Sequence, residues 1–184
     1  MRNKWNKWIA TIVTLILVVT LVPAAMAGKF HFNSIDFNLG GSLVLQGSLV
    51  GLGNQVAEVM LTGYGTVSAL CQNYGGQQAL GRNPILVEAQ QSGLFISGDN
   101  GRALVRVVAP DPTAPEYEPS PTPKEAGCPN GKWNVVGVID GSTNWTSARV
   151  VVMDDLGQIQ IDQTFTCTTT FENGLATGVS CIES

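Results

Sequence analysis

The sequence predicts an all-β protein: a single antiparallel β-sandwich of about nine or ten strands, Ig-like in general architecture, preceded by a cleavable signal peptide. Three observations lead to this prediction. Apolar and polar residues alternate with period two along most of the chain after residue 27. Gly, Asn, Asp and Pro interrupt this alternation at intervals typical of turns. Helix-forming residues never assemble into an amphipathic run.

The first 27 residues have the features of an export signal. Arg2, Lys4 and Lys7 precede an apolar run over residues 9–22, and residues 25–27 read Ala-Met-Ala, a small-x-small cleavage signature. The apolar run is about 14 residues, shorter than the roughly 20 that a membrane-spanning helix needs. We therefore expect cleavage after residue 27, no permanent membrane span, and a secreted, extracellular location of bacterial type.

Size and charge limit the possible partners of the mature chain. Removal of 27 residues from 184 leaves 157, which is the length of one ordinary domain. Three of the ten basic residues lie in the signal and all fourteen acidic residues follow it, so the mature net charge is −7. Nucleic acid is excluded as an expected partner, because phosphate contacts need clustered Lys and Arg.

The first half of the mature chain is expected to form strands separated by Gly- and Asn-rich turns. The expected strands cover residues 30–37, 43–49, 56–61, 67–71, 85–89, 94–96 and 103–109. Turns are expected at residues 51–54, in a Gly- and Gln-rich loop over residues 72–83, and in a hairpin at residues 99–101. The alternation places Cys71 on an inward face and leaves Arg102 and Arg106 facing water.

A Pro-rich segment separates the two halves. Six prolines occur within residues 110–123, so this stretch cannot continue a strand ladder and should be extended. It could be an SH3-like ligand, a linker between domains, or a crossover within one domain at about residues 110–127. The last is favoured because residues 128–184 form too short a segment for a convincing independent core.

The second half is expected to add about four strands. These are residues 133–139, 148–152, 159–167 and 175–181, with a turn at residues 154–157. In the third of them Ile159, Ile161, Phe165 and Cys167 are expected on the inward face, and Leu175 shares one side of the last strand with Cys181.

Four cysteines in an exported chain predict two disulfides, for which three connectivities exist. We favour Cys71 with Cys128, holding the two halves of the sandwich together, and Cys167 with Cys181. The pairs Cys128 with Cys167 and Cys71 with Cys181 remain the alternative.

The second favoured bridge requires a particular register. Residues 172–174 read Glu-Asn-Gly, a hairpin turn signal, and a strict two-residue turn at Asn173-Gly174 would put Cys167 opposite Ser180. A β-bulge, or a three- or five-residue loop, must shift the register by one residue to bring Cys167 opposite Cys181.

Three short motifs carry a resemblance. They are GLGN at residues 51–54, LCQNYGG at 70–76 with Asn-Pro at 83–84, and CPNGKW at 128–133. Together they resemble a group of small secreted bacterial proteins with a C-x-N-x-G-G loop and a C-P-N-x-x-W segment. The resemblance implies export, a β fold and the two motif cysteines as possible partners, and it supplies no catalytic residues.

Candidates for chemistry are few. His31 is the only histidine, and no nucleophile motif accompanies it, so no catalytic residue is predicted and replacement of His31 is expected to be without catalytic effect. Adjacent Asp154 and Asp155 fit a turn better than a convergent acid pair. No C-x-x-C occurs, and the acidic turns at residues 99–101 and 140–141 lack the full spacing of a calcium loop. No metal or cofactor is expected.

Aromatic residues give the best indication of binding. Trp145, in a polar segment, and Tyr74, beside a Gly-rich loop, are the candidate ligand-binding residues, because exposed aromatic rings stack on sugars, whereas Trp133 is expected in the core. The favoured hypothesis is a secreted, non-catalytic extracellular module with a structural or binding role at the cell envelope or in the medium. Its partner would be a polysaccharide or another cell-surface protein. The alternative is a secreted polysaccharide-directed enzyme or carbohydrate-binding module.

Overall fold

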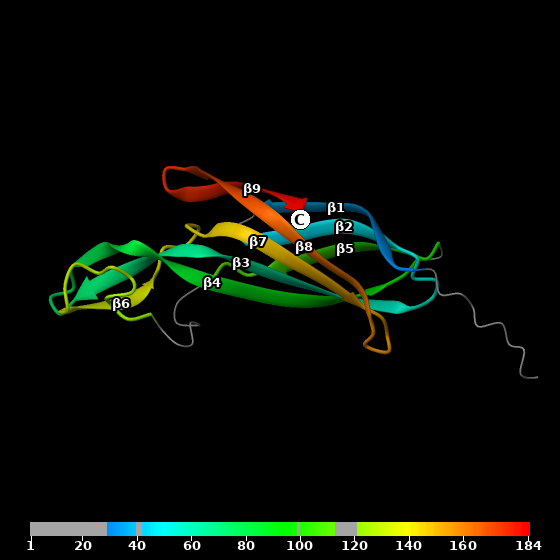
Figure 1. The fold of residues 1–184 in the computed structure, drawn as a ribbon, viewed down its shortest axis with the longest axis horizontal. Coiled ribbons are helices and arrows are strands. Elements are labelled where there is room, and N and C mark those ends of the chain that lie inside the picture. Colours follow the sequence, from blue (N-terminus) through cyan, green and yellow to red (C-terminus); the bar gives the residue numbers. More distant parts are fainter. Residues whose placement is uncertain (1–28, 40–41, 99, 113–120) are drawn as a thin grey trace, which may run out of the picture.

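The computed structural model describes residues 29–39, 42–98, 100–112 and 121–184. The signal segment, Asp99 and residues 113–120 of the Pro-rich segment lie outside the described residues. Within them the chain forms antiparallel strands in two sheets that pack face to face (Figure 1). The prediction of an all-β antiparallel sandwich is therefore confirmed.

Nine strands are described. They are β1 (His31–Leu39), β2 (Leu43–Val50), β3 (Val56–Asn73), β4 (Gln78–Ile96), β5 (Arg102–Ala109), β6 (Trp133–Val138), β7 (Asn144–Met153), β8 (Ile159–Glu172) and β9 (Leu175–Glu183). The smaller sheet has the order β1-β2-β5, and the larger has the order β4-β3-β7-β8-β9, with β6 pairing β3 beyond the end of β7. Strands that precede and follow the Pro-rich segment thus share one sheet.

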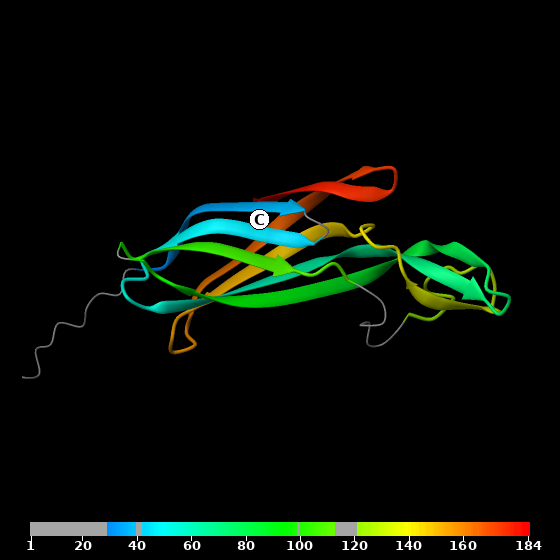
Figure 2. The ribbon, with the colours of Figure 1, turned by 180° about the vertical axis from the view of Figure 1, so that it is seen from behind.

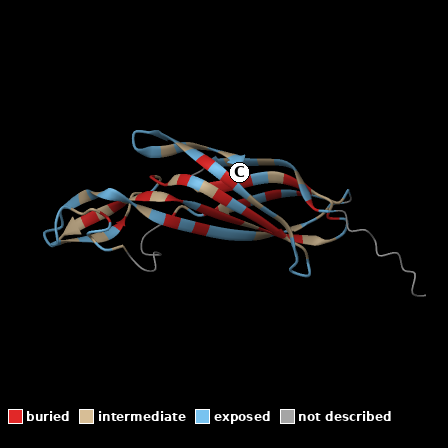
Figure 3. Cartoon of the chain, viewed as in Figure 1, coloured by how far each residue is buried: buried red, intermediate tan, exposed pale blue. Residues whose placement is uncertain are grey.

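The core lies between the sheets and is built by the predicted alternation. Its members are aliphatic residues of β2, β3, β5 and β7, with Phe165 from β8 and Trp145 at the start of β7; Figure 3 shows them as buried stripes along the strands. The largest side chains that are almost fully buried are Trp145, Leu43, Leu45, Leu49, Leu52 and Leu61. β5 and most of β3 bury every second side chain, as a period-two pattern predicts, whereas β2 and β7 also bury consecutive residues.

The turn at residues 51–54 and the connection from β4 to β5 cross between the sheets, and this corrects the expected hairpin at residues 99–101, of which Asp99 lies outside the described residues. The first connection joins β2 to β3 and the second joins β4 to β5, and in each case the two joined strands lie in different sheets. The two turns pack together: Leu52 N donates to the Gly101 carbonyl at 3.2 Å, and Ser97 Oγ donates to the Gly53 carbonyl at 2.6 Å. An Asn-Gly signal specifies a local chain reversal, but core burial decides which strand the chain then joins.

The prediction of a loop over residues 72–83 is wrong. β3 runs without interruption to Asn73 and β4 begins at Gln78, so only residues 74–77 form a turn between two long strands. The segments expected separately at 56–61 and 67–71 are parts of one strand. Gly63 and Gly65 lie between them, and a Cβ at Gly63 would lie 2.7 Å from the Trp145 ring. Gly63 admits the indole against the sheet and Gly65 admits the backbone of Asn144 and Trp145, and neither ends the strand.

The β8–β9 hairpin has a bulge, one of the register shifts that the sequence left open. Asn173 and Gly174 form the turn with φ of 52° and 83°, and the register shifts between Thr170 and Phe171. Cys167 consequently faces Cys181 directly and the two are disulfide-bonded, which confirms this pair.

One inward-facing prediction in the second half is wrong. Ile159 is 60% exposed, whereas Phe165 and Cys167 are buried as expected. Ile159 begins its strand next to a turn. At such strand ends the alternation continues although no opposing strand covers it.

Candidate functional site

The C-terminal part of β3 and the N-terminal part of β4 extend beyond the sandwich as an arm. We define the arm as residues 69–83, β6 and residues 121–132; Figures 1 and 2 show it projecting from one end of the molecule. β6 pairs with β3 from Ala69 to Asn73, and β4 pairs with β3 on the other side. The arm is therefore a short three-stranded sheet continuous with the larger sheet of the sandwich.

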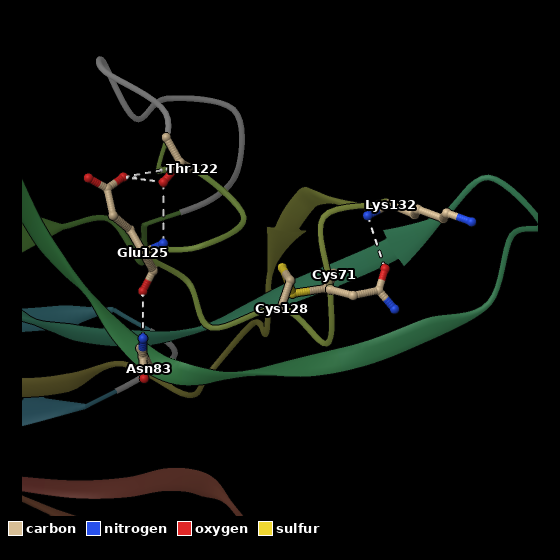
Figure 4. Close-up of a disulfide and its surroundings, with 7 residues drawn as sticks. Cys71, Asn83, Thr122, Glu125, Cys128 and Lys132 are labelled. Carbon is tan, nitrogen blue, oxygen red and sulfur yellow. Dashed lines mark hydrogen bonds between the residues drawn. A yellow bond between two sulfur atoms is a disulfide. The ribbon is translucent and has the colours of Figure 1, made fainter.

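The Cys71–Cys128 disulfide closes this arm, as the sequence predicted for the pairing. Cys71 is fully buried on β3, and its Cα lies 5.8 Å from that of Cys128, in the segment that follows the Pro-rich stretch (Figure 4). The location corrects one expectation. The bridge does not join the two halves of the sandwich, because both of its ends lie in the arm.

Hydrogen bonds hold residues 121–128 against the edge of β4. Arg82 N donates to the Gly127 carbonyl and Asn83 N to the Ala126 carbonyl, both at 3.2 Å, and Asn83 Nδ2 donates to the Glu125 carbonyl at 3.0 Å. Figure 4 shows the last of these bonds. Ala126 is fully buried. The segment thus covers one face and one edge of the arm.

A local hydrogen-bond pair orders the start of this segment. The Thr122 amide and hydroxyl both donate to Glu125 Oε2 at 2.8 Å, and Glu125 N donates back to Thr122 Oγ1 at 3.2 Å. The bond from the Thr122 amide, followed by that from its hydroxyl, lowers the pKa of Glu125. The lowered pKa has a structural cause and gives no indication of catalysis.

The tip of the arm is an ordered turn that presents Tyr74. Asn73 Oδ1 accepts from Gly75 N at 2.9 Å and from Gln77 N at 3.0 Å, and Asn73 Nδ2 donates to Gln77 Oε1 at 2.9 Å. Gly76 N donates to the Asn73 carbonyl at 3.0 Å. Within this fixed backbone the Tyr74 side chain is 88% exposed. The prediction that Tyr74 is a ligand-binding residue stays a prediction, but the geometry makes its ring available.

Trp145 is not available in this way. Its side chain is 1% exposed, packs against Gly63 between the sheets, and is the largest of the almost fully buried side chains. This corrects the expectation that Trp145 presents its ring to a ligand. Trp133, expected in the core, is half-buried on β6, opposite Asn73.

The other shifted carboxylates also have structural partners. Asp154 Oδ1 accepts from Gln158 N at 2.8 Å and from Leu156 N at 3.0 Å, and Asp154 Oδ2 accepts from Gln160 Nε2 at 2.8 Å. The bond from Gln158 N contributes most to the lowered pKa of Asp154. The turn interpretation of this aspartate is consistent with these bonds.

One exposed ion pair crosses from β7 to β8. Arg149 Nη2 lies 2.7 Å from Asp162 Oδ2, and the guanidinium hydrogen bond lowers the pKa of the carboxyl group. The two side chains are 47% and 41% exposed, so the pair contributes little to stability.

Within the described part of the chain, His31 and the remaining acidic residues form no recognisable centre. The His31 ring nitrogen Nδ1 lies 3.2 Å from the Lys29 carbonyl in an exposed position. Among the residues described, no three His, Cys, Asp or Glu side chains gather as metal ligands would. In the same part of the chain, we find no helix of sufficient length and apolar character to cross a membrane.

Comparisons with known proteins returned no match: no family model, curated protein or solved structure is significantly similar to this chain. The functional argument therefore rests on the chain's own residues.

The Asp154 turn predicts how stability depends on pH. A carboxylate whose folded pKa is lowered stabilises the native state above its unfolded pKa, ordinarily 3.8, and this contribution disappears as pH falls through the folded value. We expect the urea midpoint of unfolding to fall as pH is lowered below about 4. Asp154→Asn should be less stable than wild type at neutral pH and lose less on acidification.

Asp155→Asn is the matched control, because its neighbour Asp154 makes the turn hydrogen bonds. Urea titrations at a series of pH values would show its profile parallel to that of wild type. Parallel profiles for Asp154→Asn and wild type would contradict this account of the turn.

Proposed function

We propose that this protein is a secreted, non-catalytic binding module of the bacterial cell envelope or medium, and that it contacts its partner with the tip of the arm. One observation carries the proposal. A turn ordered by the Asn73 side chain holds Tyr74 88% exposed at the far end of a disulfide-closed arm. At this exposure the Tyr74 side chain contributes little to packing and is free to contact a partner.

The arrangement has the properties of a preorganised contact site. A tyrosine offers a large rigid ring and a polar hydroxyl at low conformational cost. Because the turn is already fixed by hydrogen bonds, binding costs little further conformational entropy of its backbone. Two disulfides indicate an oxidising, extracellular-type environment, which agrees with the export features of the first 27 residues.

A polysaccharide is the first partner to test. Gln77 and Gln78 are exposed beside Tyr74, and amide groups next to an aromatic ring can donate to and accept from sugar hydroxyls while the ring stacks on a sugar face. The tip, residues 72–78, contains no acidic residue. It therefore lacks the carboxylate pair that most glycoside cleavage requires, and we propose that it binds a glycan without cleaving it. Another cell-surface protein is the second partner class.

The test is a sedimentation assay with labelled protein and insoluble polysaccharides or envelope fractions. We expect Tyr74→Ala to weaken binding by at least about tenfold, the loss of one stacked ring, and Tyr74→Phe to retain most of it. Leu156→Ala is the control, because Leu156 is 77% exposed at the β7–β8 turn, away from the arm. Unchanged binding of Tyr74→Ala to material that wild type binds would refute the assignment of the site.

A further inference from the structure

The free edge of β4 differs from the other sheet edges. From Pro84 to Ile96 this strand pairs with β3 in unbroken register, and within the described part of the chain no backbone hydrogen bond reaches its other side. Figure 1 shows β4 along the border of the sandwich, and Figure 3 shows it largely exposed. Such an edge is a template for another strand.

The remaining edges carry protective features. β1 has a bulge between Phe32 and Ser34, and β9 pairs with β8 across the register shift between Thr170 and Phe171. β5 presents Arg102 and Arg106 to solvent. Bulges and edge charges discourage strand pairing. Over residues 84–96, β4 has one charged residue, Glu88, and its outward face carries three strongly exposed aliphatic side chains: Leu86 at 83%, Leu94 at 73% and Ile96 at 75%.

The outward-facing sequence of β4 is nearly symmetric about Gln90. Reading from the centre, Glu88 and Ser92 come next, then Leu86 and Leu94, then Pro84 and Ile96. An antiparallel pairing with the same strand of a second copy, about a two-fold axis at Gln90, therefore sets Leu86 opposite Leu94 and Pro84 opposite Ile96. Every exposed apolar side chain of this face then meets an apolar partner.

Neighbouring registers are worse. A shift of the axis by one residue towards Ile96 places Glu88 opposite Leu94. A shift of one residue the other way leaves Leu86 opposite Ser92, without an apolar partner, and a shift of two residues that way places Glu88 opposite itself. Opposed like charges destabilise a strand pair, as does a carboxylate held against an aliphatic side chain. The sequence thus favours one register.

We propose that this protein forms a homodimer by antiparallel pairing of the β4 strands of two copies, with the two-fold axis at Gln90. The larger sheets join into one continuous sheet, and the interface is the same surface on both copies, as a two-fold dimer requires. Since the arm contains the N-terminal end of β4, antiparallel pairing directs the two arms to opposite ends of the dimer. This inference is independent of what the arm binds.

Charge variants test both the interface and the register on the full chain, exported so that its disulfides form. Leu86→Lys with Leu94→Lys sets lysines opposite one another, so we expect the dimer dissociation constant in analytical ultracentrifugation to rise by about 100-fold. Leu86→Lys with Leu94→Glu sets Lys opposite Glu in the proposed register and should stay within about tenfold of wild type. Leu104→Lys with Ile182→Lys, at 81% and 70% exposed sites on other strands, is the control and should remain a dimer.

A cysteine at the axis gives a second readout. Facing residues of an antiparallel pair have Cα atoms about 4.5–5.5 Å apart, within the span of a disulfide. Gln90→Cys should therefore oxidise to a covalent dimer joined at residue 90, whereas Thr166→Cys, exposed on β8, should not. A monomeric wild type at about 100 µM would overturn the proposal. So would a dimer that tolerates Leu86→Lys with Leu94→Lys, or one that Gln90→Cys fails to crosslink.

Discussion

Replacement of Trp145 by alanine is expected to lower the free energy of unfolding by about 3–5 kcal/mol, the largest effect of any single substitution in this chain. The indole is 1% exposed and lies between the sheets against Gly63, where neither sheet can collapse onto the space that it leaves. Because a domain of this size is stable by about 5–15 kcal/mol, such a loss would leave a marginal protein.

Urea unfolding followed by circular dichroism measures this loss without relying on the fluorescence of the residue removed. Tyr74→Ala is the comparison within the same protein, since an 88% exposed side chain should cost less than about 0.5 kcal/mol. A decrease in the free energy of unfolding below about 1 kcal/mol for Trp145→Ala would contradict the burial of the indole and favour a surface position for it.

Removal of the Cys71–Cys128 bridge is expected to have the second large effect. On the chain-entropy model a crosslink that spans 57 residues stabilises by about 4 kcal/mol, and one that spans 14 residues, as between Cys167 and Cys181, by about 3 kcal/mol. The double change Cys71→Ala with Cys128→Ala should therefore lower the melting temperature more than Cys167→Ala with Cys181→Ala.

The position of each bridge predicts where the structure loosens. Without Cys71–Cys128, amide hydrogen exchange should rise in β6 and in residues 121–128, while β2 and the centre of β7 keep their protection. Without Cys167–Cys181, the increase should be confined to the β8–β9 hairpin. Non-reducing peptide mapping of wild type is the control for the pairing, and a peptide joining Cys128 to Cys167 would contradict it.

The sequence was sufficient to predict the sandwich, because strand burial depends on a local rule, and to favour the observed pairing of the cysteines, in which Cys71 and Cys128 were the pair left once Cys167 was joined to Cys181. Period-two alternation identifies the buried face of a strand without knowledge of its neighbours. The Cys167–Cys181 bridge was favoured because the two cysteines flank the Asn173-Gly174 turn signal, and it required a bulge or a longer loop to shift the register by one residue; the structure has the bulge.

What the sequence did not predict depends on contacts between distant segments. The Asn-Gly turn after β4 reverses the chain, but only the core decides that β5 joins β2 in the other sheet. Trp145 lies in a segment of Ser, Thr and Asn that is typical of an exposed loop. A signal of its burial lies on another strand: a glycine within a strand pattern, here Gly63 in β3, indicates close approach of another group.

The arm was missed for a related reason. Gly75, Gly76 and the surrounding glutamines suggested a long loop, whereas the side chain of Asn73 closes a four-residue turn and strand pairing continues on both sides of it. Asparagine is a residue that commonly closes such turns with its own side chain, so the tip could have been placed at Asn73 from the sequence.

The central claim, that a disulfide-closed arm presents Tyr74 to an extracellular partner, is tested most directly by equilibrium binding of three variants to the same polysaccharide or envelope material. We expect Tyr74→Ala and the Cys71→Ala, Cys128→Ala double change to weaken binding, the first by removing the contact and the second by loosening its support. We expect the Cys167→Ala, Cys181→Ala double change to bind as wild type does, at a temperature where all are folded. Equal binding by wild type and Tyr74→Ala would contradict the claim.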